Sequence, residues 1–154
     1  MGIKGKFEVE YEINCNGDIL HEIFSSRPHN LCEMSPLNVH SCELHEGEFG
    51  KVGSVLDWSY TLDGQQQVGK ELIEEIDEEN KLVRFKLIEG DILNEFVSLT
   101  SIVQTIPKGE SLSGIRLTFE FEKIHDDGHY PTKLIDAMIK ITKDIEAQHQ
   151  PTSI

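Results

Sequence analysis

The sequence predicts one α+β domain in which a curved antiparallel sheet of seven strands packs against one long C-terminal helix. One strand opens the chain, two short helical pieces follow, and six further segments with the period of strands are joined by tight turns. A single amphipathic helix closes this order, and no repeat or low-complexity linker interrupts it. A meander of this length must curl, and one helix laid in its concave side covers its apolar face.

The first strand and the two helical pieces follow from periodicity and capping. Residues 3–13 alternate apolar and charged side chains, which predicts a strand with one face on a core. Residues 19–24 place apolar side chains at helical spacing, with Asp18 as the expected N-cap. A second helical piece is expected over residues 29–34, where a Ser-Pro pair ends it.

Six later segments have the features of strands. They cover residues 37–46, 54–62, 65–76, 81–90, 92–106 and 114–124. Asp63-Gly64 is a strong signal for a two-residue hairpin turn. Turns are also expected at 77–80, 107–109 and 126–128, which are rich in Gly, Pro, Asn and Asp.

Residues 131–148 predict the long helix. Its apolar stripe consists of Leu134, Ile135, Met138, Ile139, Ile141, Thr142 and Ile145. Pro131 is tolerated in the first turn, and Pro151 is expected to stop the helix. At about 1.5 Å per residue the helix extends roughly 25 Å, which is longer than a cap on a small sheet needs.

Periodicity leaves two interpretations of this stripe open. The first is core packing alone. The second is that the helix forms the lid of a ligand cavity, in which Met138 would supply an adaptable contact and Thr142 a polar one.

Length and charge limit the classes of function. A chain of 154 residues is expected to form one domain, residues 1–154, with a core that needs no disulfide or metal for support. The 28 acidic residues outnumber the 14 basic ones, and the net charge of -14 is spread along the chain. Such a surface repels phosphate backbones and anionic membranes. We therefore expect no nucleic-acid or membrane partner, and a small neutral or cationic ligand is favoured.

The cysteines and the N-terminus indicate a cytoplasmic protein. Cys15, Cys32 and Cys42 form no CxxC pair, and an odd number of widely spaced cysteines suits reduced thiols. No apolar run approaches the roughly 18 residues of a membrane span, and no apolar signal segment opens the chain. Gly2 does not complete a myristoylation signal, because Lys6 stands where Ser or Thr is required.

One loop has regularly spaced glycines. Gly47, Gly50 and Gly53 lie three residues apart, but a phosphate-binding loop would need Gly-Lys followed by Ser or Thr at the start of a helix. Here Val52 follows Lys51, and strands are expected on both sides. The glycines therefore predict positive φ angles in a tight hairpin tip.

Metal-binding and nucleophilic patterns are weak. His40 with Cys42, or His125 with His129, would be candidate metal ligands, but neither pair has partners at a recognisable spacing. The sequence has no Gly-x-Ser-x-Gly motif and no spacing typical of a Cys, His and acid triad. We therefore expect no metal and no cofactor.

Several strings along the chain carry a resemblance to a known family. They are EIF at 22–24, MSPLNV at 34–39, HEGEFGKVGSV at 45–55, YTLDG at 60–64, EEIDEEN at 74–80, FKLIEGDIL at 85–93 and ITKDIE at 141–146. Together with the order of elements, they resemble the major latex protein branch of the Bet v I (birch-pollen-allergen) superfamily over essentially the whole chain. The resemblance implies a helix-grip fold, in which the sheet wraps round the long helix and encloses a hydrophobic cavity.

The resemblance also implies a class of function. Members of this superfamily are carriers of apolar plant metabolites and defence- or ripening-associated proteins, and a few branches are enzymes or hormone receptors. The norcoclaurine-synthase-like branch uses an inward lysine on the last strand, whereas the inward residues between Ile115 and Phe121 are apolar here. The hormone-receptor branch uses a Ser-Gly-Leu-Pro gate loop, which TLDGQQQ at 61–67 does not match. Ribonuclease activity fits poorly with the net charge of -14.

The register implied by the resemblance gives a candidate ligand site. It turns three polar residues inward: Tyr60, Glu71 and Ser101. The alternative for each is a solvated or hydrogen-bonded strand residue. The remaining expected lining residues are Phe24, Trp58, Phe85, Leu87, Leu99, Leu117, Phe119, Ile135, Met138, Ile139 and Thr142. A cavity of this kind needs only a few polar groups to orient a ligand.

Two functions follow from this site. The first is a monomeric cytoplasmic carrier for an apolar or amphipathic small molecule of the sterol, flavonoid, fatty-acid or alkaloid class. The second is an isomerase- or cyclase-type enzyme of plant specialised metabolism, in which a buried Glu71 with a raised pKa acts as general base.

Overall fold

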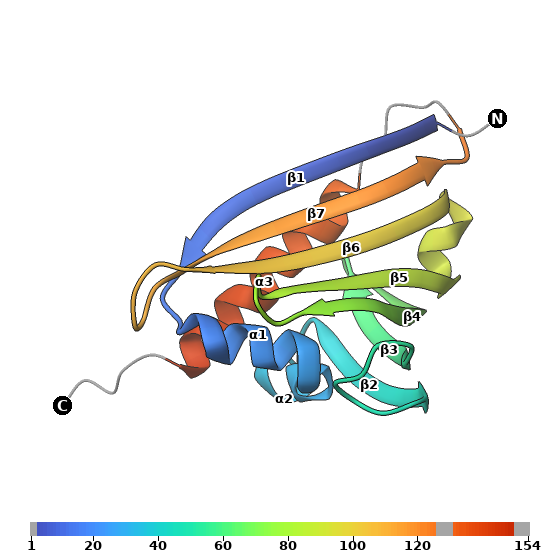
Figure 1. The fold of residues 1–154 in the computed structure, drawn as a ribbon. Coiled ribbons are helices and arrows are strands. Elements are labelled where there is room, and N and C mark those ends of the chain that lie inside the picture. The colour runs from blue at the N-terminus through green and yellow to red at the C-terminus, as the bar shows by residue number, and fades with distance from the viewer. Residues whose placement is uncertain (1–2, 126–130, 150–154) are drawn as a thin grey trace.

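The computed structural model describes residues 3–125 and 131–149, which form one curved seven-stranded antiparallel sheet and three α-helices (Figure 1). The strand order is β1-β7-β6-β5-β4-β3-β2, so β1 and β2 are the edges. The strands are β1 (Ile3–Ile13), β2 (Val39–Glu46), β3 (Val55–Leu62), β4 (Gln65–Asp77), β5 (Leu82–Gly90), β6 (Phe96–Pro107) and β7 (Ser113–Lys123). The helices are α1 (Gly17–Ser26), α2 (Leu31–Met34) and α3 (Thr132–Gln148), with short 3₁₀ turns η1 (Pro28–Asn30) and η2 (Asp91–Asn94). The predicted α+β class and its order of elements are confirmed.

The start of α1 differs from the prediction. The N-cap is Asn16, whose side-chain oxygen accepts hydrogen bonds from the backbone N–H groups of Asp18 and Ile19. The prediction of Asp18 as the cap is therefore wrong, because the asparagine two residues earlier satisfies the free N–H groups of the first turn. Asp18 instead lies 2.7 Å from the ammonium group of Lys81, just before β5.

The start of β6 also differs. Residues 92–94 were expected in the strand, but they belong to η2, and β6 begins at Phe96. Gly90 has a φ of 140°, and a side chain there would lie 2.6 Å from the Val68 carbonyl oxygen. The Asp91 carboxylate then accepts a hydrogen bond from the Val68 N–H at 2.8 Å. The chain therefore turns sharply before it enters β6, although Ile92 is buried as a strand residue would be.

The short turns have the backbone that the sequence predicts. Asp63 and Gly64 have φ angles of 50° and 78°, as a two-residue hairpin requires. Positive φ angles also occur at all three glycines of the 47–53 loop. The turn at 126–128, the helix stop at Pro151, Gly2 and His129 lie outside the described residues.

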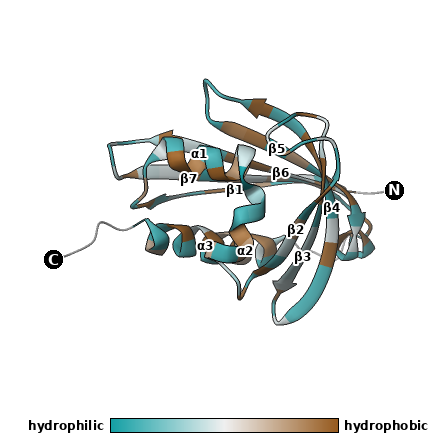
Figure 2. Ribbon diagram, turned by 90° about the horizontal axis from the view of Figure 1, so that it is seen from below, coloured by the Kyte–Doolittle hydropathy of each residue, from teal (hydrophilic) through white to brown (hydrophobic). Residues whose placement is uncertain are grey.

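The helices lie on the concave side of the sheet. Seen from below, the sheet curls around α3, and hydrophobic and hydrophilic residues alternate along its strands (Figure 2). Near one end of α3, α1 packs on β5 and β6, and α2 lies between β2 and α3. One apolar layer therefore fills the space between sheet and helices, while the opposite face of the sheet is open to solvent.

The two halves of α3 are held differently. In its C-terminal half Ile141, Thr142 and Ile145 are buried. The Thr142 hydroxyl lies 2.7 Å from the Tyr11 hydroxyl of β1, and the Ser35 hydroxyl donates to the Asp144 carboxylate at 2.6 Å. In the N-terminal half only Ile135 is fully buried. The helix is therefore anchored at its C-terminal half and less closely packed at its N-terminal half.

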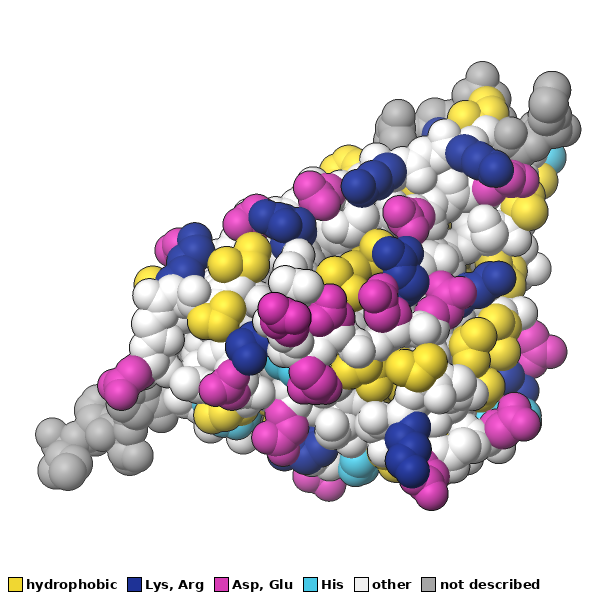
Figure 3. Space-filling model, in the orientation of Figure 1, with side chains coloured by type: hydrophobic (Ala, Val, Ile, Leu, Met, Phe, Trp, Pro, Cys, Tyr) yellow, Lys and Arg dark blue, Asp and Glu magenta, His cyan; other side chains and the backbone are white. Residues whose placement is uncertain are grey.

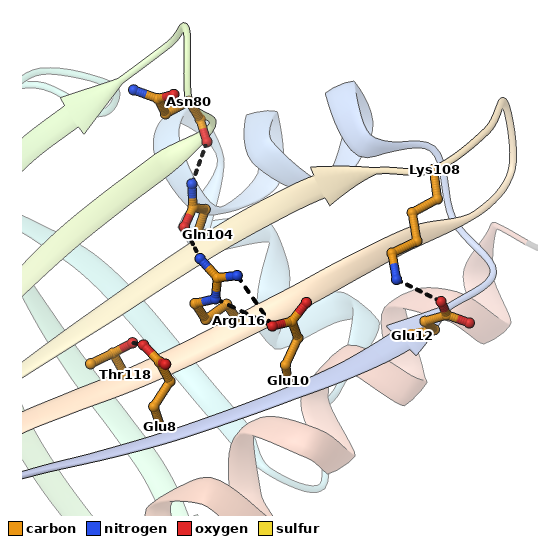
Figure 4. Close-up of polar contacts among 8 residues, drawn as sticks. All are labelled: Glu8, Glu10, Glu12, Asn80, Gln104, Lys108, Arg116 and Thr118. Atoms are coloured by element: carbon orange, nitrogen blue, oxygen red, sulfur yellow. Dashed lines mark hydrogen bonds and ion pairs between the residues drawn. The ribbon is translucent and has the colours of Figure 1, made fainter.

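The outer face of the sheet has polar contacts, and Figure 4 shows three separate sets of them. One runs from Glu10 of β1 through Arg116 of β7 and Gln104 of β6 to the Asn80 carbonyl in the β4–β5 turn. The other two join Lys108 to Glu12 and Thr118 to Glu8. Acidic and basic side chains intermingle on this face of the molecule (Figure 3). Because exposed ion pairs contribute little to stability, these contacts add little to the stability of the fold. Their main effect is to keep the surface of the sheet charged.

The anchor of α3 predicts a large cost for truncating its buried side chains. Ile145 is 0% exposed, and we expect Ile145→Ala to lower the free energy of unfolding by about 2–5 kcal/mol, since it leaves a cavity in a close-packed layer. Lys140→Ala on the exposed side of the same helix is the control, with an expected change within about 0.5 kcal/mol. Urea unfolding measures both, and equal stabilities of the two variants would contradict the anchor.

Candidate functional site

An apolar cavity of about 140 Å³ lies between the concave face of the sheet and the N-terminal half of α3. Its wall contains residues from the helical segment 24–31, from strands β2 to β7, and from α3. A cavity of this volume has room for several water molecules. Both interpretations of the helix stripe therefore apply to part of it. Leu134, Met138 and Ile141 line the cavity, whereas Thr142 and Ile145 pack in the core.

Ten of the residues proposed from the sequence lie on the cavity wall. They are Phe24, Trp58, Tyr60, Glu71, Phe85, Leu87, Leu99, Ser101, Phe119 and Met138. Strand pairing explains part of this grouping, because Phe85, Ser101 and Phe119 form one cross-strand row on β5, β6 and β7. Residues in such a row point to the same face of the sheet.

Four proposed residues do not reach the cavity: Leu117, Ile135, Ile139 and Thr142. Leu117 is 1% exposed and packs in the same cluster as Ile141 and Ile145. The other three follow one another at helical spacing on the side of α3 that brings Thr142 to Tyr11 of β1. The cavity receives the neighbouring stripe of Leu134, Ala137, Met138 and Ile141 instead.

Sequence reasoning missed twelve wall residues. They are Pro28, Leu31, Asn38, Val39, Thr61, Leu62, Gly69, Ile92, Val103, Leu134, Ala137 and Ile141. Leu134 and Ile141 were part of the predicted apolar stripe, so the pattern contained a signal for them. The residues of the helical segment and of η2 carried no such signal, because tertiary packing alone brings those segments to the cavity.

Glu71 is the acidic group of the cavity wall. It pairs with Leu56 of β3 and Leu87 of β5, both buried, so the inward side of β4 places its carboxyl among apolar neighbours. Desolvation by burial raises the pKa of Glu71 from its ordinary 4.5 to about 7. The residue keeps some accessible surface, as its place on a cavity wall requires.

Trp58 lies diagonally across the β3–β4 pair from Glu71. Its direct partner is Gly69, which has no side chain to compete for the space. The Trp58 indole N–H lowers the pKa of Glu71 in part, but its geometry is not that of a full hydrogen bond, and no other described residue accepts its proton. One buried donor therefore stands unsatisfied beside one buried carboxyl.

The Glu71 carboxyl also affects the pKa values of Tyr60 and Cys42. Desolvation by burial and then the charge of Glu71 raise the pKa of the Tyr60 phenol and of the Cys42 thiol. Both groups are therefore neutral near pH 7. The Tyr60 hydroxyl donates to the Gln67 side-chain oxygen at 3.3 Å.

Several residues where α3 passes β3 line the cavity and keep accessible surface. They are Asn38, Thr61, Leu134 and Ala137. Lys133 at the start of α3 pairs with Asp63 of the β3–β4 turn at 3.3 Å.

The other patterns noted in the sequence contribute no residue to the cavity wall. None of Gly47, Gly50 and Gly53 is on its wall, and a side chain on Gly50 would meet Ser26 of α1. His40 is hydrogen-bonded to Thr61. In residues 3–125 and 131–149, no group of three or more His, Cys, Asp or Glu side chains is placed to hold a metal ion.

A curved antiparallel sheet that holds one long helix over an apolar cavity defines a helix-grip protein, a class whose cavity suits small hydrophobic ligands. Residues 2–149 match the model of the Pathogenesis-related protein Bet v 1 family. The chain belongs to this family, and its curated relatives place it in the major latex protein branch.

Relatives cover nearly the whole chain. MLP-like protein 43 of Arabidopsis thaliana is 42% identical over 143 residues, which are 92% of this chain and 90% of that protein. The crystal structure of ginseng major latex-like protein 151 from Panax ginseng has a TM-score of 0.92 and 42% identity, and the match covers 97% of this chain and all of that one, 100%. Norcoclaurine synthase from Thalictrum flavum, in complex with dopamine and hydroxybenzaldehyde, matches with a TM-score of 0.74 at 18% identity over 98% of this chain and 91% of that one, which shows the fold alone. Within the part of the chain that the structure describes, no helix is long and apolar enough to span a membrane.

The raised pKa of Glu71 predicts a pH-dependent stability. A carboxyl whose pKa rises on folding stabilises the protein while it is protonated, and this contribution is lost as the pH rises from about 4.5 through about 7. At roughly 1.4 kcal/mol per pKa unit, the loss is roughly 3 kcal/mol. We therefore expect Glu71→Gln to gain roughly that much stability relative to the unaltered protein between about pH 4 and pH 8.

Urea unfolding at several pH values measures this gain. Glu74→Gln is the matched control, because it removes an exposed carboxyl from the same strand, and its stability difference is expected to be the same at both ends of the range. A pH-independent difference for Glu71→Gln would show that this carboxyl is not desolvated.

Proposed function

We propose that the chain is a cytoplasmic carrier that holds an apolar or amphipathic small molecule in the cavity between the sheet and α3. The observation that supports this is the composition of the wall, which is apolar and aromatic except for a few polar groups such as Tyr60, Glu71 and Ser101. Sites for small organic ligands have this composition. All of these residues belong to one chain, which supports a carrier that binds its ligand as a monomer.

The affinity expected of such a site is moderate. Burial of apolar ligand surface contributes about 25 cal/mol per Å², so a flat ligand gains several kcal/mol before its orientation is fixed. Part of this gain is offset by the lost freedom of the ligand. We expect micromolar dissociation constants and broad selectivity among plant metabolites of the sterol, flavonoid, fatty-acid or alkaloid class. A role in defence or ripening fits the branch to which the relatives belong.

Native mass spectrometry of the purified protein, followed by solvent extraction, tests the carrier directly. A stoichiometric apolar small molecule would support the proposal and identify the ligand class. A protein that is isolated empty, and that no panel of apolar ligands stabilises against thermal unfolding, would overturn it.

Filling the cavity should weaken binding while the fold is retained. Ala137 lies on the wall in the less tightly packed half of α3, and we expect Ala137→Trp to weaken binding of the uncharged fluorescent probe N-phenylnaphthylamine at least about tenfold, a difference of about 1.4 kcal/mol. Lys140→Trp adds the same ring to the exposed side of the helix and should leave the affinity unchanged. Equal affinity of the two variants would place the probe outside the cavity.

The second candidate is an isomerase- or cyclase-type enzyme. The specific observation in its favour is Glu71, a carboxyl with a pKa of about 7 on the wall of an apolar cavity, where it would exchange protons readily at neutral pH. Any turnover of a plant metabolite should then depend on a group that titrates near pH 7 and should be lost in Glu71→Gln. Full activity in that variant would reject the role of general base.

A further inference from the structure

We propose that the cavity selects ligands with a protonated amine on a flat apolar body, and that the Glu71 carboxylate pairs with the ammonium group. This proposal rests on the carrier function and specifies its ligand class. It narrows the four classes that suit an apolar cavity to the basic nitrogen compounds, and it makes anionic ligands poor occupants.

The charged groups on the cavity wall favour a cationic ligand. Among the described residues that form the wall, Glu71 has the one carboxyl, and there is no Lys, Arg or His. A ligand carboxylate or phosphate would therefore be buried without a counter-charge and close to an acid. A ligand ammonium would find a single opposite charge in surroundings where charge pairs are weakly screened.

Glu71 has little else to pair with in the free protein. Its neighbours across the sheet, Leu56 and Leu87, are apolar. Trp58 offers one N–H without the geometry of a full hydrogen bond. Folding already removes water from the Glu71 carboxyl. The main desolvation cost of binding is therefore the loss of the ligand's own hydration. An ammonium with up to three N–H donors can satisfy the free lone pairs of the carboxylate.

The aromatic groups add to the same preference. Phe24, Trp58, Tyr60, Phe85 and Phe119 all contribute to the wall, and the faces of aromatic rings attract cations as well as flat apolar bodies. A neutral alcohol gains from the apolar contact alone. A protonated amine gains from the rings and from the carboxylate.

The exterior favours the same ligands during entry. The net charge of -14 attracts cations to the surface and repels anions. Such long-range steering weakens as salt is added. The preference inside the cavity is screened much less, so salt separates the two effects.

Isothermal titration calorimetry with three probes on one skeleton tests the proposal: naphthylethylamine, naphthylethanol and naphthylacetate. Near pH 8 and at moderate salt, we expect the amine to bind about tenfold more tightly than the alcohol, as a charge-assisted contact to a buried acid predicts, and the acetate to bind most weakly. In Glu71→Gln the amine should lose its preference and bind no more tightly than the alcohol binds to the same variant. Glu74→Gln, which removes the same charge from an exposed position of β4, should keep the full preference for the amine.

The outcomes separate the ligand class from the carrier function. Equal binding of amine and alcohol to the unaltered protein, or an amine preference that survives in Glu71→Gln, would overturn the amine proposal and leave the carrier intact. Failure of all three probes to bind would overturn the carrier as well. Thermal unfolding of Glu71→Gln keeps the test interpretable, because a folded variant that still binds the alcohol has an intact cavity.

The pH dependence of binding provides an independent arm. Amine affinity should fall as the pH drops below about 7, where the Glu71 carboxyl takes up a proton, while the affinity of the alcohol stays level. The other titratable groups that sense Glu71 are Cys42 on β2 and Tyr60 on β3, and both stay neutral over this range because their pKa values are raised. An amine affinity without this dependence would contradict the pairing with Glu71.

Discussion

The concave apolar face of the sheet is wider than a single helix can cover. The cavity and its unusual polar groups depend on this difference in width. At its C-terminal half α3 meets the sheet closely, with Ile141 and Ile145 buried and Thr142 tied to Tyr11 of β1. At its N-terminal half only Ile135 is buried, and the cavity separates Leu134 and Met138 from sheet residues such as Trp58 of β3 and Phe85 of β5. The cavity is what remains when a rigid straight element is laid along a surface that twists.

The same difference in width determines which buried polar groups have a shifted pKa or lack a hydrogen-bond partner. Strand alternation alone would turn Glu71 inward, but an inward acid against a close-packed helix would be excluded or paired. The cavity tolerates it, because the carboxyl keeps some accessible surface while apolar residues surround it. A gap in the packing is therefore the condition for both the raised pKa of Glu71 and the unsatisfied indole N–H of Trp58.

The fold was readable from the sequence because its signals are local. Strand alternation, the Asp63-Gly64 turn and the amphipathic period of α3 each depend on a few neighbouring residues, and all agree with the observed elements. Errors arose where two local solutions compete. Asn16 and Asp18 are both good caps, and Ile92 would be buried in either a strand or a 3₁₀ turn.

The site was less predictable because it depends on position along the elements. Leu117 and Phe119 share the inward face of β7, yet one packs with Ile141 and Ile145 and the other faces the cavity. No alternation pattern distinguishes two inward positions on one strand. On α3 the stripe predicted from the sequence contains both the side that meets β1 and the side that meets the cavity, and only the docking angle separates Ile139 from Met138.

Charges inside the cavity are screened less by solvent than charges on the surface of this protein. This difference determines which of its charged residues can distinguish one ligand from another. On the outer face of the sheet acids and bases lie in a network such as Glu10, Arg116 and Gln104, where solvent screens each contact. Replacing one of these acids would shift the net charge of -14 by a single unit and leave any ligand in the cavity unaffected. Glu71 contributes the same unit of charge to the total, but its surroundings let that unit discriminate between ligands of one shape. A protein with a strongly acidic surface can therefore derive its selectivity from one acid that contributes almost nothing to that surface.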